Sequence, residues 1–532
     1  MKLRVAMAQI NPKSGDLSGN AEKIVEGLQW AREREAELVV FPEMCLPGYC
    51  LDEKLLINLR FLRENRRVLD EVVTPACRGL TAVVGFVDFD EARGNPGRGI
   101  VRYNAAAVVE DGRVVQIVHK RLLPAYRYFD DKRYFEPGRS VEPVEFSTRK
   151  GKCSLGVLIC EDLWEEGYEL KPSRILKGKG AQILVCVSAS PFVASTPGER
   201  NGKRFVREEL LRRQIDLCGL PMLFVNTVGV GDNGKNVIPF DGFSVAFGRD
   251  GGRAAQLKAF EEDRTVIEFS DGRAPEVAEP PFDREEEIYR ALVMSVRDYY
   301  EKVGIFQGVL EAVSGGVDSA LGSVIACDAV GSERLSLYNL PSKFNSEQTR
   351  SAARKLAENL GVEFRVVPIQ GIVDRVIEDF EKHLHPIRRS TTVENLQARI
   401  RGLIMMAESN DREALLLANG NETEIALGYA TLYGDMVGGL AVIGDLPKPD
   451  VYRLAGFVNE RWGREIIPGE TLTMPASAEL KEGQVDPFDY DVVGPILSDF
   501  VEKGFGPEEV EEMFRRRSLP VERYGLRERN LY

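Results

Sequence analysis

Residues 308–330 read GVLEAVSGGVDSALGSVIACDAV, in which an apolar run enters the hexapeptide SGGVDS at residues 314–319. A helical pattern follows through Val330. Glycines let the backbone pack closely on an anion, and the N–H groups at a helix start, together with hydroxyl groups, hold phosphate oxygens. Asp318 can bind Mg²⁺, which bridges such oxygens. The stretch predicts a strand, a pyrophosphate-binding loop and a helix; a plain glycine turn into a helix is the alternative.

The segments after this stretch alternate between strand and helix patterns. We expect strands at 334–341, 363–369 and 413–421, and helices at 346–360 and 392–409. Such β-loop-α alternation predicts a parallel, doubly wound sheet. Ligands of these sheets bind at the carboxyl ends of the strands, which is where the glycine loop is expected.

The first half of the chain is also predicted to be α/β. Its short apolar runs are nearly continuous, which is typical of sheets buried on both faces. Residues 104–119 are typical of a hairpin that turns at Asp111-Gly112. The expected strands are 3–10, 37–43, 80–88, 153–160, 181–190 and 221–229, and the expected helices are 18–36, 54–78 and 200–219.

A linker is predicted between the halves. Residues 271–286, DGRAPEVAEPPFDREE, are rich in proline and acid and have no apolar period. Such segments are typical of domain boundaries. We therefore expect one domain at 1–270 and another at 287–532.

The composition excludes several classes of protein. The chain has 532 residues, of which 43% are hydrophobic, so a largely disordered chain is excluded. Its 70 Lys and Arg against 83 Asp and Glu give a net charge of −13, which argues against a nucleic-acid partner. Eight cysteines without a CxxC pair are too sparse for a disulfide scaffold or a zinc ribbon. Without a run of 18 apolar residues we expect no membrane partner and a cytoplasmic location.

Three segments of the first half place reactive side chains after apolar strands. FPEMCLPGY carries Glu43, HKRLLPAYRYFDDKRYFEPG carries Lys120, and GVLICEDLW carries Cys160. An ammonium group favours the reactive thiolate, a carboxylate can take the thiol proton, and both can serve amide hydrolysis. Taken singly, each has a plainer interpretation as a core cysteine or a solvated charge.

In this order the three segments resemble the signature of the nitrilase, or carbon–nitrogen hydrolase, superfamily over about residues 1–270. The resemblance implies an αββα sandwich, with Glu43 as general base, Lys120 as stabilising cation and Cys160 as nucleophile. One difference concerns Asp131, which stands where related glutaminase domains usually carry a glutamate and is one methylene shorter. The resemblance further implies three glutamine-binding residues: Tyr126, Glu161 and Ser190.

The second half resembles a different family. SGGVDS looks like the phosphate-binding motif of ATP pyrophosphatases, which have the adenine nucleotide alpha hydrolase-like fold. NLQARIRG (395–402), NGNETEIALGYATLYGDMVGGLAVIGDLPK (419–448) and PASAELKEGQVD (475–486) are similar to NAD synthetases. This resemblance implies a Mg²⁺ site made by Asp318 and Glu424. It also implies ATP binding by Ser314, Gly315, Gly316, Val317, Asp318, Ser319, Arg399, Asn419 and Lys448.

Together the resemblances imply one reaction, in which deamido-NAD, ATP, glutamine and water give NAD, AMP, pyrophosphate and glutamate. Departures from the family patterns leave two alternatives open. Asn419 replaces a usual hydroxyl residue and Glu422 replaces a usual lysine, which would permit an ATP-dependent amidotransferase that acts on another carboxylate. The shortened Asp131 leaves open a synthetase that uses free ammonia only. Relatives are homo-oligomers, so we expect one here.

Overall fold

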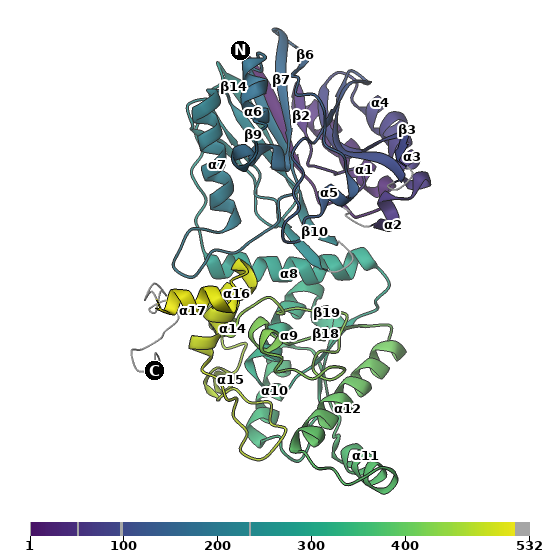
Figure 1. Cartoon of the computed structure of the whole chain (residues 1–532), viewed down its shortest axis with the longest axis vertical. Coiled ribbons are helices and arrows are strands. Elements are labelled where there is room, and N and C mark those ends of the chain that lie inside the picture. Colours follow the sequence, from purple (N-terminus) through teal and green to yellow (C-terminus); the bar gives the residue numbers. More distant parts are fainter. Residues whose placement is uncertain (1, 50–52, 96–98, 233–235, 516–532) are drawn as a thin grey trace. The chain divides into compact units, whose positions relative to one another are not determined.

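The computed structural model describes residues 2–49, 53–95, 99–232 and 236–515 (Figure 1). The chain divides into an N-terminal unit, residues 1–287, and a C-terminal unit, residues 288–532. Each unit is considered by itself below. The linker predicted at 271–286 ends next to this division, and its bounds stay a prediction.

The N-terminal unit contains two mixed sheets. The first has, in spatial order, β14 (Asp263–Ser270), β1 (Lys2–Gln9), β2 (Leu38–Val40), β3 (Thr81–Asn95), β4 (Gly99–Glu110) and β5 (Arg113–His119). The second has β13 (Arg253–Gln256), β12 (Val245–Phe247), β9 (Met222–Asn226), β8 (Ile183–Ser188), β7 (Gly151–Ile159) and β6 (Val144–Thr148). A separate hairpin pairs β10 (Val228–Asp232) with β11 (Val237–Asp241).

The two sheets stack face to face, because side chains of β1 and β2 share one buried cluster with those of β7, β8 and β9. Helix α1 packs on the outer face of the first sheet, and helices α6 and α7 pack on that of the second. This confirms the αββα sandwich. The helical elements are α1 (Leu17–Glu33), α2 (Glu53–Leu56), α3 (Leu59–Val68), η1 (Leu69–Val73), α4 (Thr74–Ala76), α5 (Asp131–Tyr134), η2 (Cys160–Leu163), η3 (Glu165–Gly167), α6 (Pro172–Gly178) and α7 (Lys203–Cys218).

Two local predictions have different outcomes. The hairpin is confirmed: Asp111 and Gly112, at φ 47° and 77°, supply the two positive φ angles that its tight turn requires. The single helix expected over 54–78 is instead divided. Asn58 caps the start of α3 through its side chain, and η1 is a π-helical turn that ends just before Pro75, whose nitrogen cannot donate a hydrogen bond.

The C-terminal unit is built on a parallel sheet, as predicted. Its spatial order is β17 (Glu363–Val366), β16 (Leu335–Asn339), β15 (Val309–Ala312), β18 (Leu415–Ala418) and β19 (Leu440–Ala441). In chain order, β16 and β17 follow on one side of β15, and β18 and β19 follow on the other side. The order therefore reverses between β15 and β18, which is where doubly wound sheets bind their ligands.

Helices cover both faces of this sheet. Helices α11 and α12 pack against Leu310 of β15 and Leu416 of β18, whereas α9, which starts at Val317, lies on the other face, where Glu311 points. The helices are α8 (Arg284–Val303), α9 (Val317–Val330), η4 (Ser332–Arg334), α10 (Glu347–Leu360), α11 (Gln370–His383), α12 (Ser390–Asp411), α13 (Glu422–Leu427), α14 (Lys448–Trp462), α15 (Gly469–Thr473), α16 (Tyr490–Lys503) and α17 (Pro507–Arg515). Among the helices of the described ranges, none is long and apolar enough to cross a membrane.

Candidate active sites

A buried lysine lies between two carboxylates in the N-terminal unit. Lys120 follows β5, and its Nζ is 2.9 Å from Oε1 of Glu43 and 2.7 Å from Oδ2 of Asp131. Glu43 follows β2 and is fixed further by Nδ2 of Asn104 at 2.7 Å and by the N–H of Ala189 at 2.7 Å. The side chains of the lysine and both acids are at most 1% exposed. Four segments distant in sequence thus converge on one sealed site.

The charge of Lys120 is set by its partners. Burial alone would lower its pKa, but Asp131 and Glu43 outweigh burial and hold the pKa above its ordinary value. Lys120 therefore stays an ammonium ion. The shorter side chain of Asp131 does reach Lys120, so the methylene missing at this position does not break the contact.

Cys160 presents its thiol at the end of β7. It is the first residue of η2, and its φ of 43° is uncommon for a residue with a side chain. Burial raises the pKa of the thiol, the negative charge of Glu43 raises it further, and Lys120 opposes both. The resting sulfur is therefore a thiol, whose proton must pass to a base before it can attack.

Two tyrosines flank the residue after the nucleophile. The hydroxyl of Tyr126 donates to Oε2 of Glu161 at 2.9 Å, and that of Tyr168 donates to Oε1 at 2.8 Å. Glu161 is 4% exposed and Tyr126 43% exposed, so the pair leads from a buried carboxylate to the surface. No sequence motif marks Tyr168, because its role depends on its contact with Glu161 in the folded chain.

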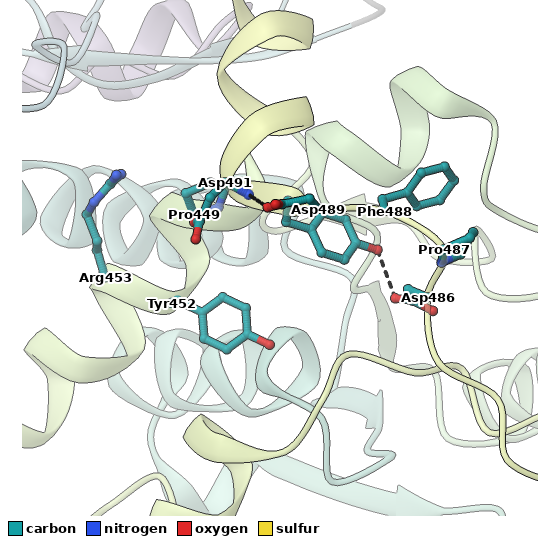
Figure 2. A pocket seen from close by; sticks show the side chains of 9 residues that line it. Pro449, Tyr452, Arg453, Asp486, Pro487, Phe488, Asp489 and Asp491 are labelled. Carbon is teal, nitrogen blue, oxygen red and sulfur yellow. Dashed lines mark hydrogen bonds between the residues drawn. The ribbon is translucent and has the colours of Figure 1, made fainter. Parts of the chain in front are cut away.

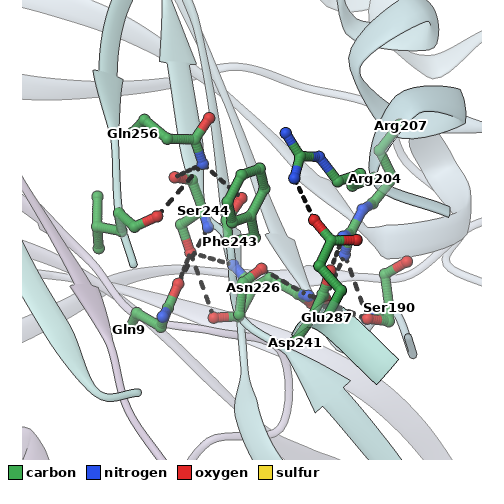
Figure 3. Close-up of polar contacts among 12 residues, drawn as sticks. Gln9, Ser190, Arg204, Arg207, Asn226, Asp241, Phe243, Ser244, Gln256 and Glu287 are labelled. Atoms are coloured by element: carbon green, nitrogen blue, oxygen red, sulfur yellow. Dashed lines mark hydrogen bonds and ion pairs between the residues drawn. The ribbon is translucent and has the colours of Figure 1, made fainter. Parts of the chain in front are cut away.

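A buried polar network fixes the backbone of Ser190 (Figure 3). Its N–H donates to Oδ1 of Asn226 at 2.8 Å, and Nδ2 of Asn226 donates back to its carbonyl at 3.0 Å. Arg207 pairs with Asp241, and Nδ2 of Asn226 reaches the same carboxylate at 3.1 Å. The hydroxyl of Ser190 is buried and has no hydrogen-bond partner among the described residues. It is therefore free to meet a ligand.

Lys203 is a residue that sequence reasoning missed. It begins α7, and its Nζ lies 3.8 Å from the ring centroid of Trp164. Burial lowers its pKa to about 8, and its charge interacts with those of Cys160 and Glu161. No motif marks this lysine, because only the fold brings α7 to the nucleophile.

The C-terminal unit places the glycine loop between β15 and α9. Gly315 has a φ of 97°, and a Cβ at this residue would lie 2.2 Å from the carbonyl oxygen of Thr349. Only glycine fits this position. The N–H of Gly316 donates to Oγ of Ser314 at 3.1 Å, and Oγ of Ser319 donates to the carbonyl of Gly316 at 3.2 Å. The loop thus leads directly into the N-terminus of a 14-residue helix.

A second lysine lies between two carboxylates next to this loop. Nζ of Lys448 is 2.5 Å from Oδ2 of Asp318 and 3.1 Å from Oε1 of Glu424. Nδ2 of Asn421 donates to the other oxygen of Asp318 at 2.9 Å. Burial raises the pKa of Glu424 to about 7, with Asp318 adding to the rise and Lys448 opposing it. Asn421 is a further residue that sequence reasoning did not single out.

Comparisons with known proteins assign a family to each half of the chain. The carbon–nitrogen hydrolase family matches residues 4–273, and the NAD synthase family matches residues 288–523. The chain is 37% identical to the glutamine-dependent NAD(+) synthetase of Thermotoga maritima, over 96% of this chain and 90% of that protein. The chain belongs to the glutamine-dependent NAD(+) synthetase family. It is thus an ATP-dependent, glutamine-hydrolysing ligase.

Other members of the family give the same result. The synthetase of a Synechocystis strain is 36% identical over 95% of this chain and 90% of that protein. The structure of the Acinetobacter baumannii synthetase in complex with ADP superimposes with a TM-score of 0.80 at 32% identity, covering 97% of this chain and 93% of that one. The predicted family, fold class and activity are therefore confirmed.

Two residues expected to contact ATP in this synthetase have other partners. Nε of Arg399 donates to the carbonyl of Leu432 at 3.1 Å, and Arg399 is exposed. Nδ2 of Asn419 donates to the carbonyl of Ala312 at 3.4 Å. Their contacts with ATP stay predictions.

A cavity of about 880 Å³ lies at the start of α14 and α16 of the synthetase (Figure 2). Nζ of Lys448 is 5.3 Å from the ring centroid of Tyr490, whose hydroxyl donates to Oδ2 of Asp486 at 2.8 Å. The cavity is lined by Pro449, Tyr452, Arg453, Asp486, Pro487, Phe488, Asp489, Tyr490 and Asp491. It gives a small molecule space next to the carboxylate–lysine cluster.

Proposed function

We propose that the two lysine sites divide the synthetase reaction between them. The N-terminal site releases ammonia from glutamine, and the C-terminal site uses ATP to activate deamido-NAD for attack by that ammonia. The observation that carries the proposal is that each unit holds a buried lysine between two carboxylates. One lysine lies beside a thiol and the other beside a phosphate-binding loop.

In the first site, Glu43 takes the proton of Cys160 as the sulfur attacks the carboxamide carbon of glutamine. Lys120 and the backbone N–H of Glu161 stabilise the tetrahedral oxyanion. Glu43 then gives the proton to the leaving nitrogen, and ammonia departs from a thioester. Water attacks the thioester while Glu43 takes one of its protons, and this proton returns to the sulfur as glutamate leaves.

Glutamine recognition is assigned to the groups around the thiol. The Glu161 carboxylate, fixed by Tyr126 and Tyr168, suits the α-ammonium group of the substrate. Lys203 suits the α-carboxylate, since its charge interacts with those of Cys160 and Glu161 and no pair of carboxylates holds it, as Glu43 and Asp131 hold Lys120. The unpartnered hydroxyl of Ser190 supplies a further hydrogen bond.

In the second site, the loop of residues 314–319 holds the phosphates of ATP at the start of α9. The residues present fit Mg²⁺, because oxygens of Asp318 and Glu424 already converge on one cation. Mg²⁺ would neutralise phosphate charge there. Lys448, with Arg399 and Asn419, completes the proposed ATP contacts. The carboxylate of deamido-NAD attacks the α-phosphate and expels pyrophosphate, and ammonia then displaces AMP; the cavity beside Lys448 gives the reactants room to approach.

We also propose that the synthetase is a cytoplasmic homo-oligomer. Exposed apolar side chains occur on α12, on α13 and in the loop after α13, and a second copy of the chain is the occupant that we propose for them. They are Leu403, Met406, Ile425, Leu432, Tyr433 and Met436. Light scattering coupled to size-exclusion chromatography tests this: Leu432→Asp should lower the measured mass, and an unchanged mass would remove this surface from the interface.

The test of the reaction is NAD formation from deamido-NAD, ATP and Mg²⁺, with either glutamine or ammonium as nitrogen source. Wild type should use both sources, whereas Cys160→Ala should use ammonium only. Cys153→Ala, which removes another buried thiol of β7, is the control and should use both. If ATP is consumed with another carboxylic acid and no NAD forms, the assignment of deamido-NAD to the second site is wrong.

A further inference from the structure

A carboxyl group with no ordinary partner lies inside the sheet behind the phosphate loop. Glu311, on β15, is 0% exposed, and neither of its oxygens has a hydrogen-bond partner among the described residues. Ionising a buried carboxyl group that has no partner costs the folded protein several kcal/mol. Such a group is therefore expected to keep its proton, or to have a function that offsets this cost. None of the steps above uses Glu311.

The strand register brings Asn419 to the same place. Glu311 of β15 pairs with Leu417 of β18, and Asn419 follows two residues later, so both side chains point to the face covered by α9. Nδ2 of Asn419 donates to the carbonyl of Ala312, while its Oδ1 is buried and has no partner in the part of the chain that the structure describes. Both residues lie at the point where the strand order reverses, directly beneath the loop.

Gly322 of α9 makes room for this pair. A Cβ at Gly322 would lie 2.5 Å from Oδ1 of Asn419 and 2.6 Å from Oε1 of Glu311. Two acceptor oxygens thus lie beside the same point of α9, and a proton on Glu311 would let one of them donate to the other. Burial raises the pKa of Glu311 to about 8, which keeps that proton in place at neutral pH.

We propose that Glu311 is a positioning residue for ATP: its protonated carboxyl group binds the amide of Asn419, one of the proposed ATP contacts, and joins the end of β15 to the end of β18. The phosphate loop leaves from the first end, and the segment with Asn421 and Glu424 leaves from the second. The pair therefore fixes the spacing between the two halves of the ATP site. This rests on the proposed function only in that ATP binds at this loop.

The groups around Glu311 are uncharged, so ionisation of its carboxyl group would change the charge behind the phosphate loop. Glu311 faces the hydroxyl of Ser323 on α9 and the amide of Asn419, and its register neighbours on β16 and β18 are Leu337 and Leu417. None of these groups is charged. Above about pH 8 the carboxyl group loses its proton, which removes the bond to Asn419 and places a negative charge behind the phosphates. ATP binding should then weaken.

The main test compares wild type with Glu311→Gln, whose amide donates at any pH. KM for ATP is measured at saturating ammonium, which bypasses glutamine hydrolysis. Between about pH 7 and pH 9, KM should rise roughly tenfold in wild type and stay level in Glu311→Gln, with kcat similar in both. Equal pH profiles of KM in the two proteins would overturn the proposal.

Calorimetric titration with Mg²⁺ and ATP, at the same two pH values, separates this result from the function itself. If wild type forms no NAD, the proposed reaction fails, yet the pH dependence of ATP affinity still decides the role of Glu311. Loss of ATP affinity at high pH in wild type but not in Glu311→Gln supports the pair. Identical affinities in both proteins at both pH values contradict it.

Gly322→Ala, on α9, tests the same contact between Glu311 and Asn419. The new methyl group should displace Asn419 or Glu311 and raise KM for ATP at least tenfold at pH 7. Gly456→Ala is the matched control, since it also adds a methyl group within a helix but meets nothing within 4 Å. A folded Gly322→Ala protein with the KM of wild type would overturn the proposal; if the variant does not fold, the pH profile of Glu311→Gln decides.

Discussion

The two lysine sites use the same three groups and differ in how they are enclosed. Lys120 and its carboxylates are at most 1% exposed, and further hydrogen bonds from Asn104 and Ala189 fix Glu43. Around Lys448, which is itself only 3% exposed, the carboxylates of Asp318 and Glu424 are each 19% exposed. One cluster is sealed and the other is open on one side.

This difference shows how similar clusters serve different chemistry. In the proposed mechanism the lysine of the sealed site is a permanent cation, so the positive charge that would stabilise an oxyanion is already in place. In the open site the carboxylates would hold Mg²⁺, and the lysine would then contact a phosphate. The following variants test this contrast.

Lys120→Met should have the largest effect. It leaves two buried carboxylates without their cation, which should destabilise the N-terminal unit by about 3–5 kcal/mol. Glutamine-dependent NAD formation should fall by roughly 10³-fold, since the oxyanion loses its cation. Thermal unfolding and activity with each nitrogen source measure both effects. A stable variant that still uses glutamine would show that the sealed lysine is dispensable.

Lys448→Met should affect activity more than stability. Ammonium-dependent NAD formation should fall by about 10²-fold, because a cation near the phosphates is lost. The unfolding free energy should fall by about 1–3 kcal/mol, less than for Lys120→Met, since the remaining carboxylates are partly exposed and Mg²⁺ could bind them. Denaturant unfolding checks this with and without Mg²⁺. A destabilisation as large as that of Lys120→Met would remove the distinction between sealed and open sites.

Lys203 has no flanking pair of acids, so burial sets its charge. Its pKa is lowered to about 8, which means that it loses its positive charge as pH rises through 8. KM for glutamine should therefore rise up to about tenfold per pH unit above 8. Lys203→Arg keeps its charge and should give a level profile. Parallel profiles for the two proteins would exclude Lys203 from binding the substrate carboxylate.

Glu422 is a buried carboxylate that pairs with no lysine among the described residues. Its substitution should give the smallest effect. Burial raises its pKa to about 7, and the nearby Glu502, Asp445 and Asp450 add to the rise. Because the folded pKa lies above the unfolded one, stability is lost as pH rises from about 4.5 through 7. Glu422→Gln should thus be more stable than wild type by about 1 kcal/mol at pH 8, and equal to it near pH 4.5. Chemical denaturation at both values measures the difference.

Local patterns explain what the sequence could predict. Glu43, Lys120 and Cys160 each follow a strand, and the glycine loop precedes a helix, so short windows place them. The residues that complete the two sites could not be predicted in this way. Asn104, Tyr168, Lys203 and Asn421 act through contacts that depend on which strands pair and which helices cover them. The break in the helix over 54–78 likewise depends on Asn58, whose side chain caps the start of α3 and outweighed the apolar pattern.

The burial of Cys160 has a consequence for how the protein reacts with electrophiles and oxidants. Within the described residues, burial raises the pKa of each free cysteine, Cys160 included. Peroxides and simple alkylating reagents attack the thiolate, which is scarce here at neutral pH. An electrophile shaped like glutamine, in contrast, brings its own contacts to Glu161 and Lys203. Covalent inhibitors of this protein should therefore gain selectivity from molecular shape rather than from intrinsic reactivity.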